Sequence, residues 1–216
     1  MRQASDTEIE STMRWMSLLQ QPGAAAILAL TLAFSVTGLL WLPALIERCV
    51  LRPYWLVRRG QWHTLVTSGL VHADFGHLLL NMLTFYFFAF QLERAIGTTR
   101  FVLLYVLALV ASDINTYLKH RNDPEYGSLG ASGAIAAVLF ASIVYYPDQS
   151  LFIIPIPVPI QAPLFALGYV AYSWYSARQA RGRINHDAHL GGALFGLLFV
   201  ALTDPGAFRK LAALLG

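Results

Sequence analysis

The chain has 216 residues, of which 56% are hydrophobic and 12% are charged, and its formal net charge is +3. A soluble domain usually carries about twice that charged fraction, so the composition excludes an ordinary soluble protein and predicts an integral membrane protein. The positive charges form no basic stripe interleaved with aromatic residues, and we expect no nucleic-acid partner. A single cysteine, Cys49, excludes an internal disulfide and a cysteine-ligated cluster.

Six apolar segments follow a polar tail of mixed charge at residues 1–20. The tail lacks the pattern of a cleaved signal peptide, so we expect it to be retained. The first three segments are long enough to span a bilayer as helices, whereas the last three have about 14 residues, or roughly 21 Å of helix. Such short segments favour a bundle in which some helices begin below the surface, beside a water-filled cavity. The six segments are 23–46, 77–96, 101–118, 133–146, 162–175 and 190–203.

The sequence therefore predicts an all-α membrane protein, with one six-helix domain at residues 21–216. The long interval at 47–76 is rich in Arg and Trp and still contains apolar residues, as in a loop that lies at the headgroup level between helices 1 and 2. Residues 154–159 are apolar but contain alternate prolines, which lack an N–H, so they cannot form a helix. We place them at an interface or against protein.

Two residues at the starts of short segments suggest chemistry. Ser132 lies fifteen residues before Pro147, and His189 lies fifteen residues before Asp204. If the three last segments all cross the membrane, the first and third run in the same direction. Ser132 and His189 then lie at one depth, roughly 22 Å from the same face, inside a hydrocarbon core about 30 Å thick.

A serine hydroxyl becomes a nucleophile when a neighbouring base takes its proton, and histidine is the side chain suited to that task near neutral pH. We predict that Ser132 is the nucleophile and His189 the base. Gly130 and Gly133 flank the serine and allow the backbone to approach a substrate carbonyl. The Ser132 N–H at a helix start is a candidate oxyanion donor.

His77 and Asn81 are four residues apart and share one helical face. Asn81 lies sixteen residues before Gly97, or roughly 24 Å from the same side as Ser132 and His189 if these helices are parallel. Both side chains are therefore candidate oxyanion donors. An interfacial histidine and an ordinary interhelical hydrogen bond are the alternatives.

Small residues predict close packing between the helices that carry Ser132 and His189. Gly133, Ala137 and Ala141 form one stripe, and Gly192 and Gly196 form another. Such stripes let helix backbones approach closely, which a direct serine–histidine contact requires. Generic membrane packing would produce the same stripes.

The motifs together resemble those of rhomboid intramembrane serine proteases, over about residues 50–205. The resemblance is carried by His72, His77 and Asn81, by Gly-Ala-Ser-Gly at 130–133, by Ala-His-x-x-Gly at 188–192, and by Leu92-Glu93 followed by Gly97. It implies a six-helix bundle and a Ser132–His189 dyad, with an oxyanion hole formed by the Ser132 N–H, His77 and Asn81. It also implies substrates that are membrane-anchored proteins cut in or near a transmembrane helix, in contact with membrane lipids. We expect a multi-pass protein of a bacterial cytoplasmic membrane.

The chain departs from the family pattern at two positions. Rhomboids often have Trp-Arg in the first long loop, whereas Trp62 is followed here by His63. Many also have an aromatic residue four positions after the serine, where it packs on the catalytic imidazole, and this chain has Ala136 there. The support of the His189 ring is therefore unassigned.

Three other functions are alternatives to the protease. His186, His189 and Asp187 with His72 or His77 could be imagined as a metal site, but the chain has no His-Glu-x-x-His motif, and we expect no metal and no cofactor. A transporter would require an inverted repeat, which is absent from the sequence. The main alternative is a catalytically silent rhomboid-like protein that binds transmembrane segments, and loss of Ser132 or His189 would have marked it.

Overall fold

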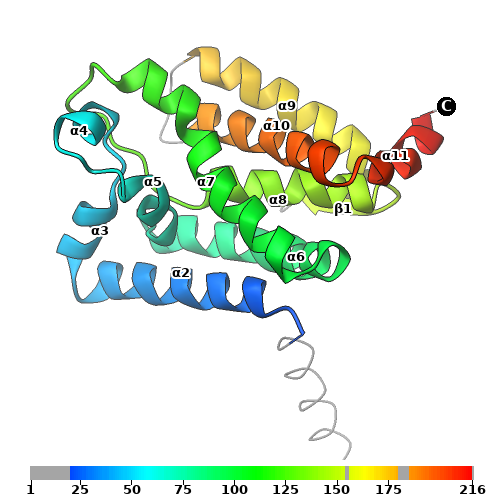
Figure 1. The fold of residues 1–216 in the computed structure, drawn as a ribbon, viewed down its shortest axis with the longest axis horizontal. Helices are drawn as coiled ribbons and strands as arrows, with labels where there is room; N and C mark the ends of the chain where they lie inside the picture. Colours follow the sequence, from blue (N-terminus) through cyan, green and yellow to red (C-terminus); the bar gives the residue numbers. More distant parts are fainter. Residues whose placement is uncertain (1–19, 154–155, 180–184, 216) are drawn as a thin grey trace, which may run out of the picture.

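The computed structural model describes residues 20–153, 156–179 and 185–215. Except for Gln20, the predicted polar tail lies outside this range. Four helices are long and apolar enough to cross a membrane: α2 (Pro22–Leu40), α6 (Phe75–Ile96), α7 (Thr98–His120) and α10 (His186–Thr203). Two further helices, α8 (Ser132–Tyr145) and α9 (Ala162–Gln179), correspond to the remaining predicted segments. The chain is thus mostly helical, with its long helices packed side by side (Figure 1).

The interval between α2 and α6 is more structured than the predicted loop. It contains the short helices α3 (Pro43–Cys49), α4 (Pro53–Arg58) and α5 (Thr64–Thr67), followed by the 3-10 turn η1 (Ser68–Leu70). The first apolar segment, predicted to reach residue 46, ends as a helix at Leu40. Pro43 is the first residue of α3, and Leu42 before it has the non-helical angles φ −136° and ψ 74°. A proline disfavours helical angles in the preceding residue and starts helices well, so it divides the segment in two.

The proline-rich segment forms a small hairpin. Strands β1 (Ser150–Ile153) and β2 (Ile156–Gln161) pair antiparallel, with Leu151 opposite Ile160. Ile154 and Pro155 lie outside the described residues, and the described part of the segment is not helical, as predicted. The turn η2 (Pro205–Ala207) and helix α11 (Phe208–Leu215) follow α10 near the carboxyl end.

Helix α8 lies inside the bundle and packs against α6, α7 and α10. Every residue from Gly133 to Val144 is buried. A helix that is apolar all round is typical of a position enclosed by other elements. This enclosure explains how a helix of 14 residues can belong to a membrane bundle without reaching both surfaces.

Helices α8 and α10 touch through their backbones. A Cβ atom added to Gly192 would collide with the carbonyl group of Gly133, and one added to Gly196 would lie 2.8 Å from Cα of Ala137. The two predicted stripes of small residues therefore face each other. Helix α7 joins the same crossing, because a Cβ on Gly191 would lie 3.0 Å from the Ser112 carbonyl oxygen.

A buried carboxylate joins the amino end of α2 to α6. Glu93 Oε1 accepts hydrogen bonds from the Gly23 N–H at 3.0 Å and the Thr98 hydroxyl at 2.7 Å, and Oε2 accepts from the Ala24 N–H at 2.6 Å. The first N–H groups of a helix lack partners within it and carry partial positive charge. Glu93 therefore satisfies the start of α2 and fixes its position on the bundle.

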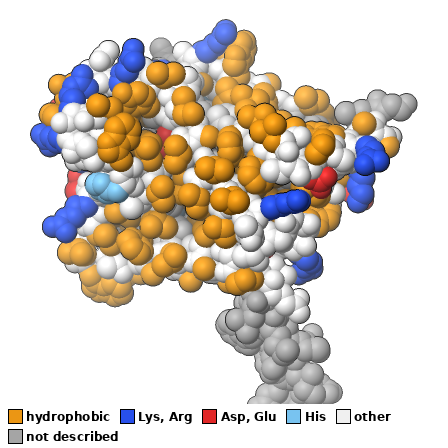
Figure 2. Space-filling model, in the orientation of Figure 1, with side chains coloured by type: hydrophobic (Ala, Val, Ile, Leu, Met, Phe, Trp, Pro, Cys, Tyr) orange, Lys and Arg blue, Asp and Glu red, His pale blue; other side chains and the backbone are white. Residues whose placement is uncertain are grey.

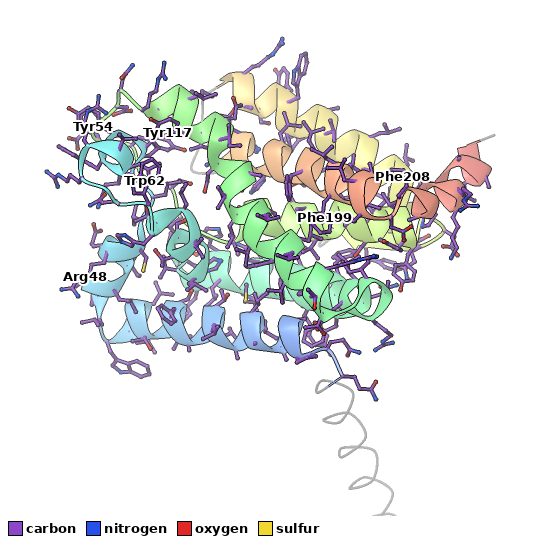
Figure 3. All side chains as sticks on the ribbon, in the orientation of Figure 1. Arg48, Tyr54, Trp62, Tyr117, Phe199 and Phe208 are labelled. Carbon is purple, nitrogen blue, oxygen red and sulfur yellow. The ribbon has the colours of Figure 1, made fainter. Side chains whose placement is uncertain are left out.

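The surface has the character of a membrane protein. Figure 2 shows hydrophobic side chains over the middle of the bundle and most Lys and Arg side chains toward its two ends. Arg48, Tyr54 and Trp62 lie at one end, and Phe208 lies at the other (Figure 3). At the first end, the Arg58 guanidinium lies 3.9 Å above the Tyr54 ring. Aromatic and basic residues at the ends of an apolar band are typical of the two bilayer interfaces.

We predict that Gly196→Ala destabilises the protein, because its methyl group meets the Ala137 backbone, which has no room to move. Overpacking of this kind costs about 1–3 kcal/mol. Gly168→Ala is the matched control, since Gly168 lies within α9 and a Cβ there meets no atom within 4 Å. Thermal unfolding in detergent should show a lower midpoint for the first variant only. Equal midpoints would contradict the close crossing of α8 and α10.

Candidate active site

Ser132 is the first residue of α8, at the end of a loop that is fixed to the segment between α2 and α6. Ser128 and Leu51 exchange two backbone hydrogen bonds of 2.9 Å, and the Gly130 N–H donates to the Ser68 carbonyl at 2.9 Å. Gly130 has φ +111°, a conformation that favours glycine. No side chain caps the start of α8, so the first N–H groups of the helix remain directed at the space in front of Ser132.

His189 lies in the first turn of α10. This helix begins four residues earlier than the apolar run that predicted it, with Asn185 as its cap accepting from the Ala188 N–H at 3.0 Å. The Asn185 amide also donates to the Thr116 and Ser128 hydroxyls, both at 3.0 Å. An Asn cap followed by an acidic first turn is a helix-start signal, and it marks this boundary in the sequence.

Asp187 faces α7 and not the His189 ring. Its carboxylate accepts from Lys119 Nζ at 2.8 Å and from the Asn115 amide at 2.9 Å. Asp187 therefore holds the amino end of α10 against α7. Its carboxylate is bonded to Lys119 and Asn115 and does not orient the His189 imidazole.

The crossing of α8 and α10 brings Ser132 and His189 to one cavity. A Cβ on Gly133 would lie 3.3 Å from the carbonyl oxygen of Ala188, so the neighbours of Ser132 and His189 are in contact. Both side chains line a cavity of about 890 Å³. No hydrogen bond joins them in the structure. Hydrogen bonds between catalytic groups are often long until a substrate binds, so this geometry fits a serine–histidine pair.

His77 and Asn81 come from the first turns of α6 and line the same cavity. Asp74 caps this helix by accepting from the His77 N–H at 2.7 Å. The His77 ring lies against the loop before Ser132, because a Cβ on Gly130 would be 2.7 Å from His77 Cε1. The Asn81 amide donates one N–H to the His77 carbonyl at 3.0 Å, which leaves its second N–H for another acceptor.

His72 connects these groups to α2, a contact that the sequence did not reveal. Its Nδ1 lies 2.9 Å from the Ser35 hydroxyl, whose single proton goes to the Leu70 carbonyl at 2.9 Å. Nδ1 must therefore be the donor, and Nε2 is the unprotonated nitrogen. The His72 ring is fully buried and meets the His77 ring edge-on, with centroids 4.8 Å apart. Burial, and then the nearby His77, lower the pKa of His72 to about 3.

An aromatic ring on α9 also faces the site. Tyr169 stacks on His189 with ring centroids 6.3 Å apart and an interplanar angle of 24°. Sequence reasoning missed it, because nothing in the pattern of α9 indicates which tyrosine faces α10. Ala136, four residues after Ser132, is buried in α8.

The residues imagined as a metal site are only partly brought together. The His186 and His189 rings lie 5.9 Å apart, edge to face, while Asp187 is engaged with Lys119. Across the described ranges, no three His, Cys, Asp or Glu residues are grouped closely enough to hold a metal ion.

The fold and the site define a polytopic membrane protein with a serine and a histidine in one internal cavity. The family model of the Rhomboid domain matches residues 59–205, more than half of the chain. The chain therefore belongs to the rhomboid family.

Three relatives illustrate the similarity. RHOMBOID-like protein 12, mitochondrial, of Arabidopsis thaliana is 27% identical over 70% of this chain and 49% of its own length. The Bacillus subtilis (strain 168) protein named "Putative rhomboid protease YdcA" is 43% identical over 37% of this chain and 39% of its own length. Rhomboid protein 1, mitochondrial, of Saccharomyces cerevisiae is 31% identical over 63% of this chain and 40% of its own length. The chain thus matches less than half the length of each relative.

We predict that acid destabilises the protein partly through His72. The unfolded state binds a proton near the ordinary pKa of 6.5, whereas the folded state binds it only near 3. The free energy of unfolding is therefore unaffected by His72 protonation above pH 6.5. It decreases as the pH falls from 6.5 toward 3, by up to about 1.4 kcal/mol per pH unit. His72→Asn, which keeps a donor for Ser35, should flatten the pH dependence of the unfolding free energy. His63→Asn, at an exposed histidine, is the control, and equal slopes in both variants would refute the assignment.

Proposed function

We propose that this chain is an intramembrane serine protease that cuts membrane-anchored proteins in or near a transmembrane helix. The observation that supports this most is the backbone contact between Gly133 and Gly192, which brings Ser132 and His189 to one cavity inside an apolar bundle. Membership of the rhomboid family supports the same reaction.

In the proposed reaction, His189 takes the proton of the Ser132 hydroxyl as Oγ attacks the carbonyl carbon of the scissile peptide. The resulting tetrahedral intermediate collapses when its C–N bond breaks and His189 gives the proton to the leaving amine. A water molecule, deprotonated by His189, then attacks the acyl-enzyme and releases the carboxylate product with free Ser132. The dyad needs no carboxylate partner, and Asp187 faces away from it.

The oxyanion of this intermediate would lie between the start of α8 and α6. The uncapped first turn of α8 supplies the Ser132 N–H, and the His77 ring and the Asn81 amide line the same cavity. Three donors fixed before the reaction stabilise charge that develops only in the transition state. The contact of His77 with the loop at Gly130 supports this role, since it keeps the imidazole beside the nucleophile.

The proposed membrane arrangement has six spans. To the four long apolar helices we add α8, enclosed by its neighbours, and α9, which packs on α10 and carries the exposed apolar residues Leu164 and Leu167. Transmembrane substrates and lipids are then the partners. Two of the three relatives named above are mitochondrial, so these similarities do not favour the bacterial cytoplasmic membrane expected from the sequence.

We predict that Ser132→Ala and His189→Ala each abolish cleavage of a transmembrane reporter substrate in proteoliposomes, because each removes one half of the nucleophile–base pair. Ser142→Ala is the matched control, since Ser142 lies on the same helix and its hydroxyl donates to the Phe88 carbonyl. Thermal unfolding should show that all three variants are folded. Cleavage that survives Ser132→Ala would exclude the protease, and binding without cleavage by the wild type would favour the silent, segment-binding alternative.

We predict that Asn81→Ala and His77→Ala lower kcat with little change in KM, because an oxyanion donor acts mainly in the transition state. In other enzymes, removal of one oxyanion donor lowers kcat roughly 100- to 1000-fold. We take this range as an upper bound here, because the other donors remain in each variant. Steady-state kinetics on the reporter substrate measures both constants. A rise in KM at unchanged kcat would show that these side chains bind the substrate and do not stabilise the oxyanion.

A further inference from the structure

Within the described part of the chain, no aromatic ring of α8 pairs with the His189 imidazole, whose aromatic neighbours are Tyr169 and His186. Position 136, four residues after Ser132, faces the cavity but is an alanine, with no ring to pack on the imidazole. An unsupported imidazole can rotate about two side-chain bonds, and only some rotamers direct a ring nitrogen toward Ser132. A base that spends less time in the productive rotamer lowers the turnover rate.

Helix α9 supplies rings on the other side of His189. Tyr169 lies nearly parallel to the imidazole, with centroids 6.3 Å apart. One helical turn further on, Tyr172 meets His186 edge-on at 5.4 Å, and His186 meets His189 at 5.9 Å. Two tyrosines spaced by three residues on α9 thus face two histidines spaced by three residues on α10. Aromatic pairs prefer offset-stacked and edge-to-face arrangements at these separations.

The Tyr169 ring is itself held in place. Phe140 of α8 lies 5.4 Å from it, and Phe165, one turn earlier on α9, lies 5.8 Å from it. The three rings belong to an apolar cluster that also contains the buried Leu139, Ile143 and Ala193. The Tyr169 ring is therefore restricted by its own neighbours, as a ring that limits the motion of another group must be.

We infer that Tyr169 is the positioning residue of the His189 base, so that α9, and not α8, supplies the aromatic ring that holds the imidazole. The inference rests on the proposed protease function. It also means that the productive geometry of the dyad depends on how α9 packs against α10. Displacement of α9 would free the imidazole even while Ser132 and the oxyanion donors stay in place.

The test compares Tyr169→Phe, which keeps the ring, with Tyr169→Leu and Tyr169→Met, which fill the space without one. Tyr175→Leu is the matched control, because Tyr175 lies on the same helix and is 60% exposed. Full-length protein in proteoliposomes is assayed for kcat and KM on a transmembrane reporter, with Ser132→Ala as the blank and thermal unfolding as the check on folding. We expect wild-type kinetics for Tyr169→Phe and Tyr175→Leu. Tyr169→Leu and Tyr169→Met should lower kcat by about 2- to 10-fold at unchanged KM.

The outcomes separate the two proposals. Cleavage in the Ser132→Ala blank would overturn the protease and this inference together. Cleavage that depends on Ser132 but is unchanged in Tyr169→Leu and Tyr169→Met would overturn the inference alone. The inference would also be overturned if the ring-less Tyr169 variants changed only KM and not kcat. It would be overturned as well if Tyr175→Leu lowered kcat as much as they do. If either Tyr169→Leu or Tyr169→Met is unfolded at the assay temperature, the kinetics of the other variant, measured at that temperature, test the inference.

Discussion

The site depends on one contact, in which the backbones of α8 and α10 meet at Gly133 and Gly192. No side chain separates them, since a single Cβ on Gly192 would collide with the Gly133 carbonyl group. In a lipid environment, helices do not associate by burying apolar surface from water, and close packing of small residues takes the place of that driving force. The residue before Gly133 is Ser132, and His189 lies one turn before Gly192, so the contact that joins the helices also brings the proposed nucleophile and base to one cavity.

The rest of the bundle can be understood as support for this crossing. Ser112 of α7 packs against Gly133 and Gly191, and the Asn185 cap ties the start of α10 to α7 and to the loop before α8. On the opposite side, the Gly130 loop lies against His77, and His72 links that face to Ser35 of α2. These polar contacts stay inside the protein, where each buried donor and acceptor needs a partner. The bundle, although apolar on its outside, therefore contains a cavity lined by polar groups.

Local sequence patterns were enough to predict much of this arrangement. Each of the six apolar segments is helical, the stripes at Gly133 and Gly192 face each other, and Ser132, His189, His77 and Asn81 line one cavity. The division of the first segment was missed although Pro43 marks it. The start of α10 was missed although Asn185 marks it. Other features could not be predicted, because they depend on contacts between distant segments: the Ser35–His72 bond joins α2 to a loop, and the Tyr169–His189 pair requires the rotation of α9 about its axis.

In the proposed mechanism, His189 activates Ser132 within the folded bundle. This activation is tested most directly by treating the membrane-embedded protein with a fluorophosphonate and locating the adduct by peptide mass spectrometry. We predict a single modified serine, Ser132, and a much slower reaction at that position in His189→Ala protein that remains folded. Modification of another serine, or an unchanged rate at Ser132 without His189, would contradict it.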